Sequence, residues 1–343
     1  MTNFKFLGAV LVLFVLSLGS ISVNAAQRTN IIFDTDMGND VDDVMAMDLL
    51  LKYHEAGKIN LLAVMGNRQA ESCCAFIDMY DTWFGYPNIP IGQVMNGSNP
   101  TPEEKSYATK TLSKTINGKP MFKTTHKDQK AYPNAVDLYR KILAKAKNKS
   151  VVIVSVGFSS NLSRLMETTG DEYSPLNGME LLKKKVSYIS VMAANFLPDA
   201  KPEYNVWNDV LAARKLFTES PVPLIFGTFD LGKKILYPGS SVQNDFKWTA
   251  HHPFVVAYES YKKMPYDRPT WDPISALFAI EPNMGFFSLS EKGNVAVDDK
   301  GGTVFTPDAN GKCRYLITTP EQNEKIKNYF VKCISRQPKH YLK

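Results

Sequence analysis

Cysteine is scarce in this sequence, and its placement excludes two kinds of scaffold. The chain has 343 residues and four cysteines. None of these forms a CxxC pair or a Cys/His spacing that would hold zinc. We expect Cys73 and Cys74 to be small core hydrophobes on a helix, whereas Cys313 and Cys333 could pair in an oxidising compartment. A zinc-binding module and a disulfide-dense fold are therefore excluded.

Internal repeats, low-complexity segments and basic tracts are also missing. Hydrophobic residues make up 44% of the chain and charged residues 22%, which is the composition of an ordinary globular protein. The net charge is +6, but the lysines are scattered apart from the run Lys183-Lys184-Lys185, which we interpret as a solvated helix end. We therefore predict no nucleic-acid partner.

One long apolar run is present, and it lies at the N-terminus. It covers residues 6–23, after Lys5, and small residues lead from it to Ala25. These are the parts of a secretory signal peptide that is cleaved after Ala25. A retained membrane anchor is the alternative, since about 17–25 apolar residues span a bilayer. We expect residues 1–25 to be a signal peptide, residues 26–343 to be one domain, and the mature protein to be exported, periplasmic or secreted, and free of the membrane.

Apolar runs of strand length alternate with helical patterns through most of the chain. The expected strands are residues 30–33, 59–65, 89–94, 151–156, 186–192 and 222–226. The expected helices are residues 42–54, 69–84, 131–147, 160–168, 207–217 and 321–333, and short strands within 285–305 and 314–318 suggest a small β-hairpin near the C-terminus. Continuous apolar strands that alternate with helices predict an α/β, single-domain fold, with a mostly parallel sheet covered by helices on both faces. Residues 96–130 form the longest irregular segment, either a binding loop or a surface insertion.

The end of the first strand is strongly acidic. Residues 34–43 read DTDMGNDVDD, with five carboxylates in ten residues, at the sheet edge where ligands collect in such folds. So many like charges need a cation to stay ionised, and oxygen ligands without sulfur or imidazole favour calcium or magnesium. The spacing excludes an EF-hand, because the sixth and twelfth places hold Asn39 and Met45 in place of glycine and glutamate. The alternative is that Asp42 and Asp43 merely cap the following helix.

Two phosphate-related sites are weighed against this metal site. A phosphate-cradling loop is excluded because GxxxxGK[ST] is absent. A strand followed by Asp-x-Asp resembles the haloacid-dehalogenase phosphatases, but that family has Thr or Val where this chain has Gly38. We keep the phosphatase as a minor alternative.

The acidic segment and five later motifs together resemble the calcium-dependent nucleoside hydrolases. The family signature D-x-D-x-G-x-D-D is matched by Asp34 to Asn39 and by Asp42-Asp43, with Asp40-Val41 as a two-residue insertion. Further matches follow in order along the chain: Met65-Gly66-Asn67, Val154 to Leu162, Ser190-Val191-Met192, Glu203-Tyr204-Asn205 and Trp271-Asp272-Pro273.

The resemblance implies a complete active site in residues 26–343. Ca²⁺ would be held by Asp36, Asp43, Asp272 and the backbone carbonyl of Val156. Asp42 and Asn67 would hold the ribose 2′- and 3′-hydroxyls, Glu203 and Asn205 the 5′-hydroxyl end, and Met192 would lie under the sugar. The implied substrate is a small-molecule nucleoside or riboside, and a homo-oligomer stays open.

The implied reaction is hydrolysis of the N-glycosidic bond of ribonucleosides or related N-ribosides, which gives free base and ribose. Its transition state resembles an oxocarbenium ion, so carboxylates around the sugar stabilise it. Asp36 would take a proton from water that calcium has acidified. Export together with this reaction suggests ribonucleoside catabolism outside the cytoplasm.

The chain departs from the family pattern at Trp271. The better-known members have a histidine there, which protonates the departing base, whereas Trp271 has no proton of useful acidity but could bind the substrate by stacking on the base or closing the pocket. We considered His251, His252 and Tyr204 as replacements. We also weigh a calcium-dependent ribose- or nucleoside-binding protein without efficient catalysis, and expect a preference for leaving groups that need little acid assistance. Asp40 has no counterpart in the family pattern.

Overall fold

The computed structural model describes residue 1, residues 28–126 and residues 132–342. Apart from Met1, the signal peptide expected at residues 1–25 lies outside this part of the chain. Among the described residues, no helix is both long and apolar enough to cross a membrane.

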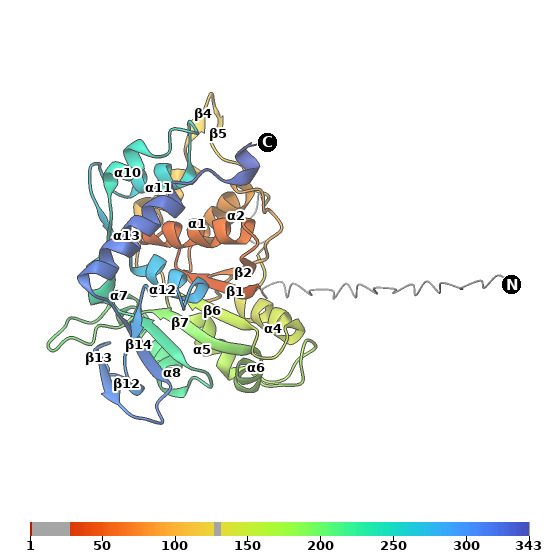
Figure 1. Cartoon of the computed structure of the whole chain (residues 1–343), viewed down its shortest axis with the longest axis vertical. Coiled ribbons are helices and arrows are strands. Elements are labelled where there is room, and N and C mark those ends of the chain that lie inside the picture. Colours follow the sequence, from red (N-terminus) through yellow and green to blue (C-terminus); the bar gives the residue numbers. More distant parts are fainter. Residues whose placement is uncertain (2–27, 127–131, 343) are drawn as a thin grey trace.

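The centre of the molecule is a ten-stranded sheet (Figure 1). Its parallel strands are β1 (Thr29–Thr35), β2 (Ile59–Gly66), β3 (Ile91–Gln93), β6 (Val151–Ser155), β7 (Val186–Met192), β8 (Leu224–Gly227) and β14 (Cys313–Ile317). The antiparallel strands β11 (Ser288–Leu289), β12 (Gly293–Val297) and β13 (Thr303–Pro307) join near the C-terminus, in the order β13-β12-β14-β8-β7-β6-β1-β2-β3 with β11 on β14. The predicted mostly parallel sheet and C-terminal β-hairpin are confirmed.

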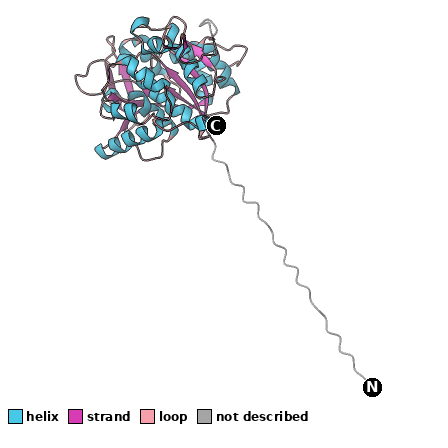
Figure 2. Ribbon diagram, turned by 90° about the horizontal axis from the view of Figure 1, so that it is seen from above, coloured by secondary structure: helices cyan, strands magenta, loops and turns pink. Residues whose placement is uncertain are grey.

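Helices cover both faces of this sheet and surround the strands (Figures 1 and 2). Successive residues of a strand point to opposite faces, so Ile31 and Phe33 enter one hydrophobic core and Ile32 enters the other. The first core lies under α1 (Asp42–Glu55), α2 (Glu71–Trp83), α11 (Pro253–Tyr261), α12 (Trp271–Ile280) and α13 (Pro320–Ile334). The second lies under α4 (Ala135–Lys145), α5 (Ser160–Glu167), α6 (Gly178–Lys185) and α8 (Val210–Glu219).

The strand and helix predictions hold best where the apolar pattern is continuous. The predicted strand 186–192 matches β7, and the Lys183-Lys184-Lys185 run ends α6 as expected. The predicted helix 207–217 is wrong in one respect, because α7 (Tyr204–Trp207) and α8 are separate helices that meet at Asn208 and Asp209. The segment 96–130 is more regular than predicted, with η1 (Glu103–Lys105), α3 (Tyr107–Leu112) and the pair β4 (Thr115–Ile116) and β5 (Lys119–Pro120). The short elements α9 (Phe229–Gly232), β9 (Leu236–Tyr237), α10 (Gly239–Asn244) and β10 (Arg268–Pro269) were not predicted.

All four cysteines are free thiols. Cys73 and Cys74 are buried on α2, as expected. The pairing considered for Cys313 and Cys333 does not occur. Cys313 lies in β14 and belongs to the second core, whereas Cys333 lies on α13 and packs against the first, so the sheet separates them.

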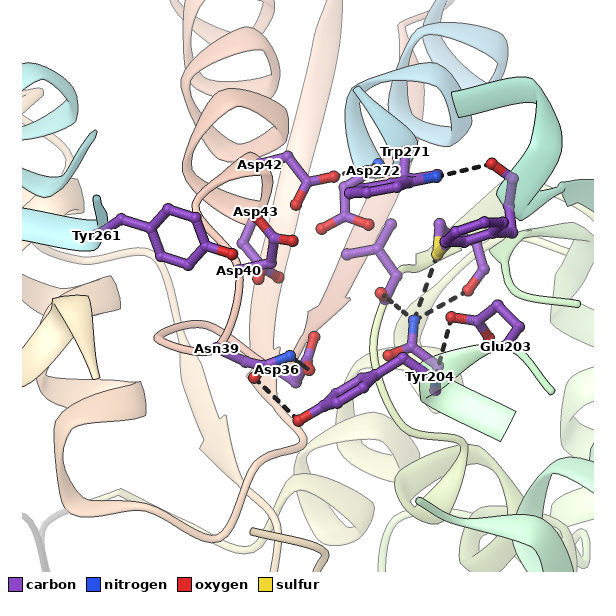
Figure 3. A pocket seen from close by; sticks show the side chains of 14 residues that line it. Asp36, Asn39, Asp40, Asp42, Asp43, Glu203, Tyr204, Tyr261, Trp271 and Asp272 are labelled. Carbon is purple, nitrogen blue, oxygen red and sulfur yellow. Dashed lines mark hydrogen bonds between the residues drawn. The ribbon is translucent and has the colours of Figure 1, made fainter. Parts of the chain in front are cut away.

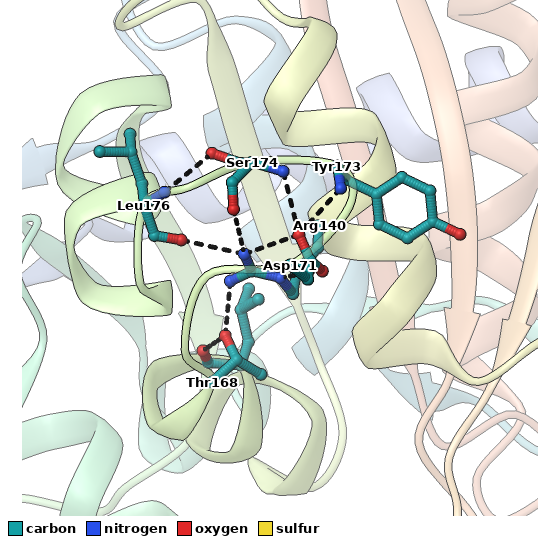
Figure 4. Close-up of polar contacts among 7 residues, drawn as sticks. Arg140, Thr168, Asp171, Tyr173, Ser174 and Leu176 are labelled. Atoms are coloured by element: carbon teal, nitrogen blue, oxygen red, sulfur yellow. Dashed lines mark hydrogen bonds and ion pairs between the residues drawn. The ribbon is translucent and has the colours of Figure 1, made fainter.

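Arg140 on α4 ties together the loop that leads from α5 to α6 (Figure 4). Its buried guanidinium pairs with Asp171 through Nε and Nη2, and Nη2 also donates to the carbonyl oxygens of Ser174 and Leu176 over 3.1 and 2.9 Å. Nη1 donates to Thr168 over 2.7 Å. A fully bonded guanidinium of this kind fixes a loop that has little apolar surface of its own.

Candidate active site

A cavity of about 240 Å³ opens at the carboxyl ends of β1, β6 and β7 (Figure 3). Here β1 has β2 on one side and β6 on the other, so the strand order reverses, and open parallel sheets bind ligands at such a point. The site residues predicted from the sequence line this cavity, with the exception of Asn67. The fourteen lining residues are Asp36, Asn39, Asp40, Asp42, Asp43, Val156, Met192, Glu203, Tyr204, Asn205, Phe229, Tyr261, Trp271 and Asp272.

Two helix N-termini bring the carboxylates together. Asp42 and Asp43 lie in the first turn of α1 and Asp272 lies in the first turn of α12, and these two helices pack against each other. The backbone N–H of Asp272 donates to Asp42 Oδ2 over 3.1 Å, and the Thr35 hydroxyl donates to Asp43. A helix N-terminus favours negative charge, so the fold supports part of the charge that it concentrates here.

Burial and mutual repulsion perturb these acids strongly. Burial, with added repulsion from Asp40, raises the pKa of Asp36 to about 7, although Arg68 opposes the shift. Burial likewise raises the pKa values of Asp42, Asp43 and Asp272 well above their usual range, and each of them is also raised by neighbouring carboxylates. Such a cluster stays ionised only when a cation balances it.

The donor set fits a hard divalent cation by its chemistry. Asp36, Asp43 and Asp272 offer carboxylate oxygens, and Val156 offers its backbone carbonyl oxygen at the end of β6. Oxygen-only ligands of this kind suit calcium. Within the described residues, however, no group of three or more His, Cys, Asp or Glu side chains has the arrangement of a metal site as it stands.

A second wall of the cavity is built on α7. Glu203 is the N-cap of this helix and accepts hydrogen bonds from the backbone N–H groups of Asn205 and Val206 over 2.9 and 3.2 Å. Burial raises the pKa of Glu203 to about 7. Asn205 Nδ2 donates to the carbonyl oxygens of Val156 and Met192 over 2.9 and 3.3 Å, which joins the ends of β6 and β7.

Asn39 links the acidic segment to this second wall. Its Nδ2 donates to Asp36 Oδ2 over 3.2 Å, and its Oδ1 accepts from the hydroxyls of Tyr204 and Thr101 over 3.0 and 2.6 Å. Arg68 is fully buried and supports the same acidic segment through Ser106. It donates to Ser106 over 3.2 Å, and the Ser106 hydroxyl donates to the carbonyl oxygen of Gly38 over 2.8 Å.

Asn67, expected to hold a ribose hydroxyl, does not line the cavity. Its Nδ2 donates to Asp34 over 2.5 Å and its Oδ1 accepts from the backbone of Phe158 over 3.1 Å. Gly157 lies between Asn67 and Asp36, because a Cβ there would come within 2.5 Å of Asn67 Oδ1 and 2.7 Å of Asp36 Oδ1. Asn67 is therefore close to the acidic cluster but faces Asp34 in this structure.

Aromatic side chains close the cavity on a third side. The indole Nε1 of Trp271 donates to the carbonyl oxygen of Phe229 over 2.8 Å, and the two rings stack with centroids 5.4 Å apart at 19°. Gly232 makes room for Trp271, since a Cβ there would lie 2.1 Å from Trp271 Cδ1. Tyr261, at the end of α11, contributes the remaining ring.

Neither of the two histidines considered as acids lines the cavity. His251 is exposed. His252 is buried at the N-cap of α11, where its Nδ1 accepts from the backbone N–H of Phe254 over 3.1 Å. His252 thus caps a helix in the core and does not reach the cavity.

The sequence left several lining residues without a role. Asp40 was noted as part of an insertion and Tyr204 as a possible acid, whereas Asn39, Phe229 and Tyr261 were given no place in the site. Phe229 could have been found, because it comes two residues after the end of β8, where site residues are expected. Tyr261 lies far from any strand end, and only packing shows that it reaches the site.

Comparisons with known proteins agree with this geometry. Residues 31–332 match a family model described as inosine-uridine preferring nucleoside hydrolase. A search of curated proteins finds no match. Among solved structures, a plant nucleoside hydrolase is 16% identical with a TM-score of 0.70 and covers 91% of this chain and 100% of its own.

Two bacterial structures have the same fold. A purine-preferring ribonucleoside hydrolase from Gardnerella vaginalis is 19% identical with a TM-score of 0.69, covering 89% of this chain and 98% of its own. An inosine-uridine preferring nucleoside hydrolase from Bacillus anthracis is 16% identical with a TM-score of 0.67, covering 90% and 99%. At these identities the likeness shows the fold, and the family model carries the assignment.

Proposed function

The chain belongs to the inosine-uridine preferring nucleoside hydrolase family, and on that premise we propose that it is a calcium-dependent hydrolase of ribonucleosides or related N-ribosides. Family membership makes it an N-glycosyl hydrolase that splits the bond between ribose and base. The phosphatase and binding-protein alternatives are set aside, because the matching family is one of nucleoside hydrolases, which are enzymes that split N-glycosidic bonds.

One observation carries the assignment of the site. Asp36, Asp42, Asp43 and Asp272 come from two segments more than 200 residues apart and line one cavity at the switch point of the sheet. Bringing several buried carboxylates together destabilises the folded protein unless a positive charge balances them. A cation and a cationic transition state are two such charges.

The proposed roles follow the family resemblance, and all of these residues except Asn67 line the cavity. Asp36, Asp43, Asp272 and the Val156 carbonyl hold Ca²⁺, Asp42 and Asn67 bind the ribose 2′- and 3′-hydroxyls, and Asn67 does so after turning from Asp34. Glu203 and Asn205 bind the 5′-hydroxyl end, Met192 supports the sugar, and Trp271 forms the wall beside the base. When bound, calcium lowers the pKa of the attacking water and neutralises the acidic cluster.

The carboxylates do the catalytic work in this proposal. Positive charge grows on the sugar as the glycosidic bond breaks. Fixed negative groups around the cavity stabilise this charge more than they stabilise the neutral substrate. Asp36 removes the proton of the attacking water, and Asn39 holds the Asp36 carboxylate in place for that step.

Two further statements belong to the proposal. Residues 1–25 direct export to the periplasm or the medium, where the enzyme would release ribose from extracellular nucleosides. Family members commonly form homo-oligomers, and we extend this to the present chain as a hypothesis for sedimentation analysis to test.

The test is ribose release from a nucleoside panel by residues 26–343. We expect release in calcium, loss of release in excess chelator, and recovery when calcium is restored. Asp36→Ala should abolish release, whereas Asp299→Ala, at a carboxylate whose side chain is 96% exposed, should leave it unchanged. Release that is indifferent to the chelator would reject calcium, and no release from any riboside would reject the proposed function.

A further inference from the structure

The replacement of the family histidine by Trp271 leaves open how the base departs. The indole N–H of Trp271 cannot serve, because it already donates to the carbonyl oxygen of Phe229 over 2.8 Å. A departing base carries developing negative charge on nitrogen, and a hydrogen-bond donor beside that atom stabilises it. We therefore considered every neutral donor that lines the cavity.

Three of these donors are already engaged. Asn39 Nδ2 donates to Asp36, the Tyr204 hydroxyl donates to Asn39, and Asn205 Nδ2 donates to backbone carbonyl oxygens. Tyr261 differs. Among the residues that the structure describes, its hydroxyl makes no hydrogen bond to protein, and Figure 3 shows it pointing into the cavity toward the carboxylates.

Tyr261 also lies at the end of the cavity where the base would lie. Figure 3 shows Tyr261 and Glu203 on opposite sides, with Asp40, Asp42 and Asp43 between them. If Glu203 binds the 5′-hydroxyl end, as proposed above, the ribose lies over the carboxylates and the base extends toward Tyr261.

A half-buried ion pair lies against the Tyr261 ring. Arg268 pairs with Asp40 through Nε and Nη2, the first over 2.8 Å. Its guanidinium lies 4.9 Å from the centroid of the Tyr261 ring and 5.2 Å from that of Trp271. A cation over an aromatic face attracts the ring, and an Arg–carboxylate fork is rigid. Asp40 also belongs to the two-residue insertion that the family signature lacks. Arg268 therefore contacts both this inserted residue and the tryptophan that replaces the family histidine.

We propose that Tyr261 donates a hydrogen bond to the leaving nitrogen of the substrate, and that Asp40 and Arg268 position it for this role. This inference rests on the proposed hydrolase function. Tyr261 keeps its proton throughout. The C1′–N bond breaks and its electron pair goes to the base, water adds to C1′ and gives a proton to Asp36, and the hydrogen-bonded base then takes a proton from solvent.

The acidity of the phenol agrees with this role. Burial raises the pKa of Tyr261, and Asp40 adds to the shift while Arg268 opposes it. The hydroxyl therefore remains a donor across the working range of the enzyme. A hydrogen bond that forms only as charge develops accelerates the bond-breaking step without tightening substrate binding.

The experiment compares two substrates in Tyr261→Phe at saturating calcium. Inosine has a poor leaving group, whereas p-nitrophenyl riboside has one that leaves without help. We expect kcat on inosine to fall about 10- to 100-fold, the range for a hydrogen bond to a charged group, with KM little changed. On p-nitrophenyl riboside kcat should change less than about threefold. Tyr188→Phe, at the opposite end of β7 and outside the cavity, controls for the loss of a phenol.

The positioning role has its own test. Arg268→Gln should lower kcat on inosine, and adding it to Tyr261→Phe should cause little further loss, because the two act as one unit. Equal losses on both substrates, or no loss on inosine, would overturn the inference while the hydrolase function stands. A wild-type enzyme that releases ribose from neither substrate would reject the proposed function and this inference with it.

Discussion

The side-chain amide of Asn39 donates to Asp36 Oδ2 over 3.2 Å, and its oxygen accepts from Tyr204 over 3.0 Å. Asn39 thus connects the proposed catalytic base on the first strand end to the helix that carries Glu203 and Asn205. A base that must meet a water molecule at one position needs this kind of support, since small displacements of a reacting group are costly.

We expect Asn39→Ala to lower kcat about tenfold, the effect of losing one hydrogen bond to a carboxylate. Asp36 would keep its charge but lose its orientation, so the apparent affinity for calcium should change much less than kcat. Ribose release and calcium titration of the same preparation measure both. Thr101→Ala removes one partner of Asn39 while keeping its contact with Asp36, so a loss as large as that of Asn39→Ala would contradict the positioning role.

The acidic cluster should make the stability of the protein depend on calcium. A ligand that binds only the folded state stabilises it by about 2.7 kcal/mol at one hundred times its Kd. We expect calcium to raise Tm by several degrees and Asp43→Asn to abolish this response. Without calcium, Asp43→Asn should melt higher than the wild type, because the native carboxyl group must either keep a buried charge or take up a proton on folding, and the amide needs neither.

Thermal unfolding with calcium and with a chelator measures this effect. Asp299→Asn is the matched control, since its side chain is 96% exposed and lies outside the cavity. An Asp43→Asn variant that still gains stability from calcium would remove Asp43 from the proposed ligands.

The sequence predicts the central sheet well, because burial on both faces leaves a continuous apolar pattern. β6 reads VVIVS and is buried throughout, and β7 matches its predicted bounds. The acidic segment was also predictable, since a strand end followed by five carboxylates has few structural explanations. The region from Thr228 to Thr270 was not, because its short helices and two-residue strands fall below the length at which periodicity is informative.

The third wall of the site depends on contacts that a sequence pattern does not contain. Tyr261 on α11 lines the cavity and Arg268 on β10 packs against its ring, more than 200 residues after Asp40. Asn67 illustrates the opposite case. It follows a strand end as expected, but its hydrogen bonds with Asp34 and with the backbone of Phe158 hold its side chain away from the cavity lining.

Acid should weaken the loop held by Arg140. The Arg140 guanidinium lowers the pKa of Asp171 to about 2, from a usual value of 3.8. The folded-state pKa lies below the unfolded value, so the ion pair contributes its full stability above pH 3.8 and loses it as the pH falls toward 2. Asp171→Asn should therefore be less stable than the wild type at pH 6, and the difference should shrink at pH 3.

Urea unfolding at pH 6, 4 and 3 follows the difference in unfolding free energy. Arg140→Leu is the harsher variant. It leaves the carbonyl oxygens of Ser174 and Leu176 without this donor, and we expect it to cost about 2–4 kcal/mol at pH 6 and less at pH 3, where the ion pair contributes less. A constant difference between wild type and Asp171→Asn from pH 6 to pH 3 would show that the ion pair does not stabilise the fold.

His252 should give the protein a second pH dependence in a milder range. The ring is buried among Trp83, Phe246 and Trp248, with centroids 4.5, 4.8 and 5.2 Å away. Its Nε2 lies 3.8 Å from Asp48, but Asp48 already pairs with Lys52 over 2.6 Å. Burial, with repulsion from Lys52, lowers the pKa of His252 well below its usual 6.5.

The sign of this pH dependence follows from the lowered pKa of His252. In the unfolded chain His252 takes up a proton as the pH falls below 6.5, whereas the folded protein keeps it neutral, so acid favours the unfolded state. Stability from this residue is complete above pH 6.5, and about 1.4 kcal/mol should be lost between pH 7.5 and pH 5.5. His252→Asn keeps an N-cap residue for Phe254 and cannot be protonated in this range. The variant should be less stable at pH 7.5, where packing is lost, and should approach the wild type by pH 5.5. If the gap in unfolding free energy measured in urea stays constant between these two pH values, His252 is protonated in the folded protein and its environment is more polar than the aromatic shell indicates.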